Sequence, residues 1–234
     1  MIASDVDKIW SEMDFPERED VGGADTMSTI FGLRRFITPD TTYVEIGSHI
    51  GMVAVPTLHQ MKYKKAVVIE PHTQAREFLE KNIGDKATVL PYAVWDKDED
   101  VTFWDVDDSY ARGSVVRFND DTYKGVTRRK KTGKTFDTIV KELKLEPPFV
   151  IKVDVELAEA HVFRGMKNNY ENIVFMVMEF MPKYMRGCGE DPEQLLIDIE
   201  NAGFEYFAPN FGKRHSRSLF LGLDFKLDLW IRRK

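Results

Sequence analysis

Cysteine, closely spaced histidines and long apolar runs are all scarce in this chain of 234 residues. Cys188 is its single cysteine, which rules out an internal disulfide framework and suits a reducing compartment. The five histidines show no ligand spacing, and we expect no metal site. No apolar run approaches the roughly 20 residues of a membrane span, and the first residues lack the regions of a signal peptide. We therefore expect a cytoplasmic protein that does not bind membranes.

Positive charge is also in deficit. The chain carries 33 lysines and arginines against 39 acidic residues, a formal net charge of −6, which argues against nucleic acid as a partner. The basic run Arg128-Arg129-Lys130-Lys131 is an exception. It suits a solvated loop better than a site for an anionic acceptor, and both interpretations stay open. Residues 105–134 form a long irregular stretch, with a possible hairpin around Asn119, and we expect them to be a lid insertion.

The motifs of several common enzymes are missing. The chain has no G-x-S-x-G elbow, no P-loop lysine and no complete G-x-G-x-x-G. It has instead Glu45-Ile46-Gly47-Ser48-His49-Ile50-Gly51 around the end of one β-branched run, and Glu70-Pro71 after the next. Such runs are typical of buried parallel strands, whose carboxyl ends meet at a ligand crevice. Carboxylates there would repel phosphate, so the pattern favours S-adenosylmethionine (SAM), with Glu70 on the ribose hydroxyls. His72 is a weaker candidate for the ribose or adenine.

Strands and helices alternate along most of the chain, which predicts an α/β domain with a mostly parallel sheet and helices on both faces. Residues 1–40 are expected to form a helical cap, and residues 41–234 the main domain. The last two strands lack a crossover helix and should pair antiparallel. The expected strands are 43–47, 66–70, 87–91, 101–104, 149–154, 173–179, 204–208 and 225–232, and the expected helices 52–63, 73–84, 136–144, 157–168 and 191–203.

A second acidic segment, Lys152-Val153-Asp154-Val155-Glu156-Leu157-Ala158-Glu159, follows a strand later in the chain. Asp154 is expected at the carboxyl end of that strand, beside the crevice, and Glu156 and Glu159 would share a face at helical spacing. Carboxylates this close are costly unless they bind a cation, share a proton or bind a polar substrate. We interpret the segment as a polar floor beneath the sulfonium. A helix N-terminus that favours acidic residues and Mg²⁺ bound by Asp154 and Glu156 stay open as alternatives.

These segments together resemble the FkbM-type SAM-dependent methyltransferases. The resemblance covers about residues 40–182 and rests on Glu45–Gly51, Glu70-Pro71, Ala93–Asp96, Thr135–Asp137 and Lys152–Glu159. The family's first motif reads D-x-G-A-N-x-G and its later motif reads K-x-D-x-E-G-x-E. This chain has His49 in place of the asparagine and Leu157 in place of the glycine. Leu157 is the larger change, because a bulky side chain can block the substrate or force a different backbone.

The resemblance implies a Rossmann-like class I methyltransferase fold with a seven-stranded sheet, and O-methylation of a hydroxyl on a sugar or sugar-containing metabolite. A catalytically impaired SAM-binding module is a second hypothesis because of Leu157, and an amine or macromolecular acceptor is a third. Glu156 or Asp154 would be the base. By resemblance, the residues that contact the cofactor would be Glu45, Gly47, Ser48, His49, Gly51, Glu70, Pro71, Ala93, Asp96 and Asp154. The catalytic residues would be Asp154, Glu156 and Glu159. The acceptor would be bound by Lys152, His161 and Glu179.

Overall fold

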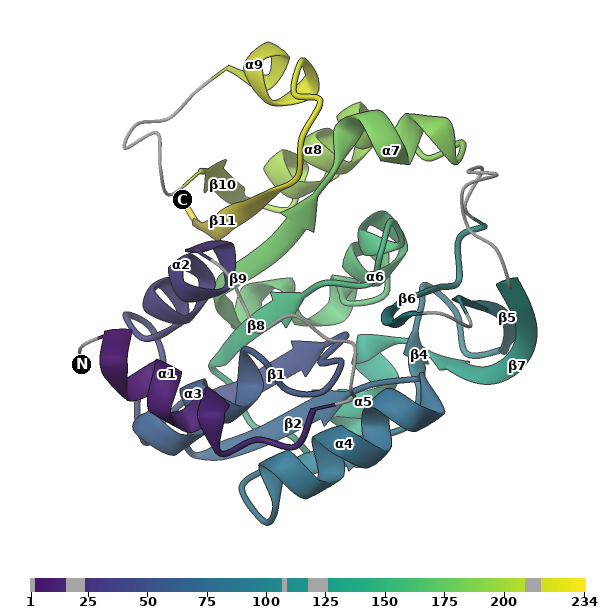
Figure 1. Cartoon of the computed structure of the whole chain (residues 1–234). Helices are drawn as coiled ribbons and strands as arrows, with labels where there is room; N and C mark the ends of the chain where they lie inside the picture. The colour runs from purple at the N-terminus through teal and green to yellow at the C-terminus, as the bar shows by residue number, and fades with distance from the viewer. Residues whose placement is uncertain (1–2, 16–23, 107–108, 118–125, 209–215) are drawn as a thin grey trace.

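The computed structural model of the chain describes residues 3–15, 24–106, 109–117, 126–208 and 216–234. These residues form a layered α/β structure in which a central sheet lies between two groups of helices (Figure 1). A smaller sheet lies beside the main one. The fold class predicted from the alternation of strands and helices is confirmed.

The described residues build a seven-stranded main sheet with the order β10-β11-β9-β8-β1-β2-β3. Neighbours among β1, β2, β3, β8 and β9 pair parallel, whereas β11 pairs antiparallel with both β9 and β10. The expected antiparallel closing strands are therefore confirmed. The bounds are β1 Thr42–Ile46, β2 Lys65–Ile69, β3 Thr88–Leu90, β8 Phe149–Val153, β9 Ile173–Phe180, β10 Phe204–Phe207 and β11 Leu227–Arg233.

The reversal of β11 brings the start of this strand to the edge where the parallel strands end. Asp228 lies opposite Glu179 in the pairing of β11 with β9. Lys226 directly precedes β11 and so lies at the same edge. This edge therefore collects residues that follow the parallel strands, such as Glu70 and Asp154, together with residues that begin the reversed one.

Successive residues of the parallel strands point to two separate hydrophobic cores. In β1, Val44 and Ile46 belong to one core and Tyr43 to the other. Because helices cover both faces, these strands are apolar almost throughout rather than alternating. The first core packs against α5 Phe136–Glu142, α6 Glu159–Arg164, α8 Pro192–Asn201 and α9 Arg217–Leu221, and the second against α1 Ala3–Ser11, α2 Ala24–Leu33, α3 Ala54–Gln60 and α4 Thr73–Ile83.

The N-terminal helices pack onto the main sheet. Trp10 of α1 is buried, and its indole Nε1 donates a hydrogen bond to the carbonyl oxygen of Met52 at 2.9 Å. Ile30 and Leu33 of α2 are fully buried in the second core. The helices α1 and α2 thus supply part of the second core.

The segment expected to be an irregular lid contains regular strands. The smaller sheet has the order β4-β7-β5-β6 and lies beside the carboxyl ends of β1 and β2 (Figure 1). The basic run predicted to be a loop lies in β7, where it pairs antiparallel with β5. The hairpin expected around Asn119 lies outside the described residues. The bounds are β4 Ala93–Val94, β5 Asp100–Val106, β6 Ser109–Ser114 and β7 Val126–Lys134.

Two expected helices begin later than predicted. The helix expected over 52–63 is α3, Ala54–Gln60, with Pro56 in its first turn. The helix expected over 157–168 is α6, which begins at Glu159, because Glu156 and Leu157 adopt left-handed φ angles of 54° and 78°. Glu156 and Glu159 therefore do not share a helical face, which corrects the prediction. The described residues also form a 3-10 helix, Lys167–Asn172, and the short helix α7, Pro182–Gly187.

Candidate active site

A pocket opens at the carboxyl edge of the main sheet, between the ends of β1, β2 and β8 and the smaller sheet. Its walls come from the loops that follow the parallel strands and from the strands β4, β5 and β6. Lys226, the residue before β11, completes the wall. We call one part the cofactor end, lined by Gly47, Ser48, His49, Glu70, Pro71, His72, Tyr92, Ala93, Val94 and Phe103. The acceptor end is lined by Lys152, Asp154, Glu156 and Lys226, with Glu179 buried behind them.

Gly47 is the point of closest approach between two strand ends. Its φ is +80°, and a Cβ added there would lie 1.7 Å from the carbonyl oxygen of Asp154. The N–H of Gly47 donates to the carbonyl of Ile69 at 2.9 Å, and the N–H of Asp154 donates to that of Ile46 at 2.9 Å. The ends of β1, β2 and β8 are thus joined through backbone atoms, and any residue with a side chain would separate them.

Gly51 shapes the turn after β1. Its φ is +97°, and a Cβ there would lie 2.7 Å from Cγ2 of Val55 and 3.1 Å from Cδ1 of Leu79. Among the described residues it is not part of the pocket wall. The glycine allows the turn after β1 to pack against α3 and α4, so it supports the loop that carries His49.

Glu70 connects two loops at the cofactor end. It is only 6% exposed. One carboxylate oxygen accepts a hydrogen bond from the N–H of His49 and the other from the N–H of His72, each at 2.7 Å. Burial raises the pKa of Glu70, and these backbone donors oppose the rise. Each oxygen keeps a further lone pair, so the carboxylate can also accept from ribose hydroxyls.

Glu45 lies at the floor of the pocket, inside β1. It accepts a hydrogen bond from the hydroxyl of Tyr43, and Nζ of Lys152, its neighbour in β8, is 4.0 Å from Oε1. Burial raises the pKa of Glu45 to about 7, against the opposing effects of Lys152 and Tyr43. A group of this kind can change its charge near neutral pH beside the methionine end of a bound cofactor.

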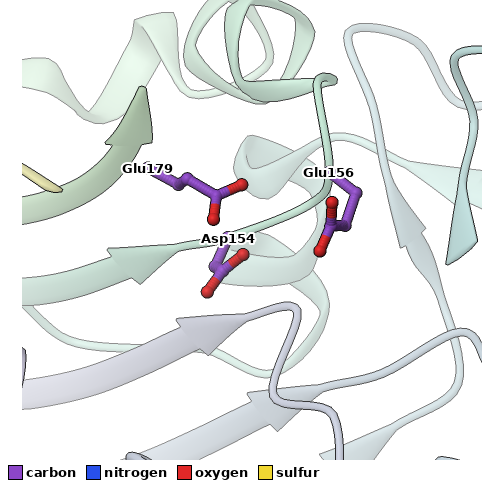
Figure 2. Close-up of side chains that lie close together, drawn as sticks. All are labelled: Asp154, Glu156 and Glu179. Atoms are coloured by element: carbon purple, nitrogen blue, oxygen red, sulfur yellow. The ribbon is translucent and has the colours of Figure 1, made fainter. Parts of the chain in front are cut away.

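Three carboxylates converge at the acceptor end (Figure 2). Asp154 follows β8, Glu156 comes two residues later, and Glu179 lies near the end of β9. One oxygen from each lies within 4.8 Å of the others, a spacing compatible with a shared cation. Nζ of Lys152 donates to Asp154 at 3.0 Å, and the ammonium of Lys226 forms an ion pair with Glu179. Two lysines therefore already provide positive charge in this cluster.

The charges of the cluster shift one another's pKa values. Burial alone raises the pKa of Asp154, but the ammonium groups of Lys152 and Lys226 outweigh it and hold that pKa below its usual range. Burial raises the pKa of Glu179 well above its ordinary value, and the neighbouring carboxylates of Asp154 and Glu156 add to the rise. Asp154 is therefore held as a carboxylate, whereas Glu179 depends on the ammonium of Lys226, which lowers its pKa, to keep its charge.

Glu159 and His161 lie outside the wall formed by the described residues. Glu159 is 1% exposed, and its carboxylate accepts a hydrogen bond from the N–H of Val155 at 3.1 Å. Burial raises its pKa to about 8. The ring of His161 stacks on Trp95 at 3.7 Å between centroids, and its Nδ1 is 2.8 Å from Asp96. The geometry thus gives Glu159, His161 and Asp96 contacts that hold the loops around the pocket.

Leu157 does not block the pocket. Its side chain is 3% exposed and packs in the first hydrophobic core. Its φ of 78° lies in the left-handed region that glycine adopts most easily. The chain therefore keeps the backbone shape that a glycine would favour and turns the larger side chain away from the crevice.

The smaller sheet closes the cofactor end. Phe103 of β5 lines the pocket, and Asp105 of the same strand lies 3.6 Å from Nε2 of His72 and 2.6 Å from Nε of Arg129 in β7. Nδ1 of His72 accepts a hydrogen bond from the N–H of Ala75 at 3.1 Å, which caps α4. The insertion is thus attached directly to the loop after β2.

Sequence reasoning missed several wall residues. Lys226 and Thr26 come from segments far from the motifs, and Tyr92 and Phe103 are aromatic residues without a motif of their own. The signal that could have found Lys226 is topological, because an antiparallel last strand must begin at the crevice edge. No such signal marks Thr26, Tyr92 or Phe103.

The residues of the pocket fit SAM. Gly47 leaves the backbone open to close approach, and Glu70 offers oxygens to a ribose. Ala93 and Val94 form an uncharged wall suited to an adenine. Asp154 is a carboxylate placed for a cationic centre. These residues would hold the nucleoside at one end of the pocket and leave its methyl group facing the acceptor end.

A family model described as the methyltransferase FkbM domain matches residues 45–206. No curated protein matches the chain. Among solved structures, a precorrin-6y C5,15-methyltransferase from Geobacter metallireducens has 9% identity and a TM-score of 0.50, over 96% of this chain and 94% of that one. A putative methyltransferase from Streptococcus mutans in complex with SAH has 7% identity and a TM-score of 0.50, over 91% and 99%.

A putative RNA methyltransferase from Pyrococcus horikoshii has 11% identity and a TM-score of 0.46, over 99% of this chain and 96% of that one. For the first two structures, at 9% and 7% identity, the likeness shows the fold alone. Within the described part of the chain, no helix is long and apolar enough to cross a membrane. The family match covers most of the chain, and the fold agrees with it. The chain belongs to the FkbM methyltransferase family and is a SAM-dependent methyltransferase.

Proposed function

We propose that this methyltransferase acts on a hydroxyl of a sugar or a sugar-containing metabolite. The observation that carries the proposal is the convergence of Asp154, Glu156 and Glu179 beside the cofactor end of the pocket (Figure 2). Carboxylates accept hydrogen bonds from hydroxyl groups and can take a hydroxyl proton. Lys152 and Lys226 at the same end add donors for the other oxygens of a polyhydroxyl acceptor.

The cofactor contacts follow from the pocket wall. Glu70 would accept from the ribose hydroxyls, Gly47 and His49 would lie against the methionine part, and Ala93 with Val94 would contact the adenine. When bound, SAM supplies an electrophilic methyl group. Asp96 and Gly51 are left out of this set, because the described wall does not include them.

Glu156 is the residue that we propose as the base. It lines the pocket and is partly exposed, so an acceptor can reach its carboxylate. Asp154 is already bonded to Lys152, which makes it a poorer proton acceptor. Methyl transfer is an in-line displacement, so most of the rate comes from holding the acceptor oxygen opposite the sulfonium. A base adds roughly 10²–10⁴-fold for a weakly acidic hydroxyl.

The test combines cofactor binding with methyl transfer. We expect the protein to bind SAM and S-adenosylhomocysteine in titration calorimetry, and to transfer labelled methyl from SAM to a member of a panel of sugars, glycosides and glycans. Glu156→Gln should reduce turnover by roughly 10²-fold or more with little change in cofactor affinity. Transfer to amines, protein or RNA with none to hydroxyl compounds would contradict the sugar assignment. Full turnover by Glu156→Gln would remove Glu156 as the base.

A further inference from the structure

Lys226 reaches the acceptor end from outside the segment that defines the family. It lies beyond residues 45–206, which the family model matches. The reversed strand β11 delivers it to the pocket wall, where its side chain is 46% exposed. Its ammonium pairs with Glu179, which is 1% exposed. A solvent-reaching cation is thus held against a buried carboxylate at the place where an acceptor must enter.

The ammonium of Lys226 balances charge that the fold has gathered. Burial alone would lower the pKa of Lys226, but Asp154 and Glu179 outweigh it and raise that pKa, so the side chain stays cationic at neutral pH. Lys152 likewise balances the charge of Asp154, because its Nζ lies 3.0 Å from a carboxylate oxygen of Asp154. A buried carboxylate left without a partner is strongly destabilising. The carboxylate cluster is therefore supplied with cations by the chain itself.

We infer that Lys226 is a built-in counter-ion that selects an uncharged acceptor group, such as a hydroxyl, and excludes ammonium groups and metal ions from the acceptor end. The inference rests on the proposed function and deepens it by naming the residue that sets acceptor charge. The site would otherwise attract a further cation to the three carboxylates, whose oxygens lie within 4.8 Å of one another. The ammonium of Lys226 takes that place.

Hydrogen bonding supports the same selection. A hydroxyl both donates and accepts, so it can donate to a carboxylate and accept from Lys226 at the same time. An ammonium group can only donate, and next to Lys226 it would meet a like charge and another donor. Like-charge contacts of this kind suppress a wrong partner, and specific sites combine such repulsion with attractive contacts to the right one.

The experiment uses three cofactor analogues and needs no identified acceptor. S-adenosylhomocysteine has a neutral sulfur, SAM a methylated sulfonium, and sinefungin a carbon bearing an amine in place of that sulfonium. The last two place a cation at the boundary with the acceptor end. Titration calorimetry gives the ratio of sinefungin to S-adenosylhomocysteine affinity, with SAM as a second cation, for the whole protein and each variant. Circular dichroism and Tm confirm folding.

Lys226→Met should raise that ratio roughly tenfold or more, the scale of one charge a few ångströms away in a partly screened site. Because burial raises the pKa of Glu179, its carboxyl can bind a proton when Lys226 is absent. The ratio of SAM to S-adenosylhomocysteine affinity is therefore also measured at about pH 7 and about pH 9, because the sulfonium keeps its charge where the amine of sinefungin begins to lose it, and the increase should be larger at the higher pH. Lys226→Arg keeps the charge and should keep the wild-type ratio.

Three further variants complete the design. Glu179→Gln leaves Lys226 without its carboxylate and should lower the ratio. The double variant Glu179→Gln with Lys226→Met removes one charge of each sign and should return the ratio close to wild type. Lys62→Met removes the same charge from an exposed position after α3, at the opposite edge of the sheet, and should change nothing.

The outcomes separate this inference from the proposed function. If the wild-type protein binds none of the three compounds, the cofactor pocket itself is wrong. If they bind and the ratio in folded Lys226→Met equals the wild-type ratio at both pH values, Lys226 does not set the charge and the inference falls. If Lys226→Met does not fold, Glu179→Gln and the double variant decide the question, because they differ only at Lys226 and equal ratios in the two overturn the inference.

Discussion

The two ends of the pocket hold their carboxylates in different ways. At the cofactor end, Glu70 accepts hydrogen bonds from the backbone N–H groups of His49 and His72. At the acceptor end, Asp154 and Glu179 are paired with lysine side chains. Backbone donors are fixed by the fold, whereas side-chain partners can be replaced without changing it. The comparison indicates why one fold can keep its cofactor while its acceptor changes.

Gly47→Ala should have the largest effect on the cofactor end, where backbone hydrogen bonds hold the loops in place. The added Cβ would lie 1.7 Å from the carbonyl oxygen of Asp154, and the residue would keep a φ of +80°. We expect the free energy of unfolding to fall by about 4 kcal/mol or more and binding of S-adenosylhomocysteine to be lost. Denaturant unfolding and calorimetry measure both.

Gly84→Ala is the matched control. Gly84 also has a positive φ, +58°, but a Cβ added there would have no described heavy atom within 4 Å. The substitution should cost about 1–3 kcal/mol, because a φ of 58° with a ψ of −130° is unfavourable for a residue with a side chain, and should leave binding intact. Equal effects at the two positions would show that the positive φ alone, and not the contact with Asp154, requires glycine at position 47.

Removing the carboxylate at the cofactor end should have the next largest effect. Glu70→Ala takes away the acceptor for two backbone N–H groups and the proposed ribose contact. We expect S-adenosylhomocysteine to bind about 1.5–3 kcal/mol more weakly. Glu77→Ala, an exposed change on α4, serves as the control. An affinity that is the same in both variants would mean that Glu70 does not contact the nucleoside.

Glu159 is a carboxylate near the acceptor end that is nevertheless held by a backbone N–H. Its pKa of about 8 in the folded protein lies above the ordinary value of 4.5. The folded state therefore keeps a proton that the unfolded state loses, and this contribution to stability is present at low pH and declines as the pH rises from 4.5 to about 8.

Glu159→Gln keeps an acceptor for Val155 and removes the titration. Its stability relative to wild type should therefore increase between about pH 5 and about pH 8, by at most about 1.4 kcal/mol for each pKa unit of the shift. Urea unfolding across that range measures the difference, with Glu77→Gln as control. A constant difference at every pH would show that Glu159 is not titrating in the folded protein.

The smallest expected effect concerns Leu157. Leu157→Ala loses a buried side chain but stays in the left-handed region, whereas Leu157→Gly loses the same contacts and relieves about 1 kcal/mol of backbone strain. We therefore expect the glycine variant to be more stable than the alanine variant by about that amount, the reverse of the usual order. Equilibrium unfolding of both variants would reveal a different ranking.

The cofactor end could be predicted because its residues are close in sequence and follow strands with a clear apolar pattern. Gly47 and Glu70 both lie where a parallel strand must end, and the structure places them in the pocket wall. Asp154 was predictable for the same reason. In each case the local pattern determines the position.

Other features depended on contacts between distant segments. The lysine- and arginine-rich strand β7 carries no apolar alternation, and its pairing with β5 gives it its structure. The left-handed angles of Glu156 and Leu157 end the helical pattern before α6, and neither residue type favours them. Lys226 could be placed only once β11 was known to run antiparallel to β9.

The sequence distances within the pocket also set an order of assembly. The cofactor end is built mainly from one short stretch, from Glu45 to His72, whose loops close at small entropic cost. The acceptor end needs Lys226, which must meet Asp154 and Glu156 from a distant part of the chain. We expect partial unfolding to release β10 and β11 together first, leaving a species that still holds the nucleoside but no longer tells one acceptor from another.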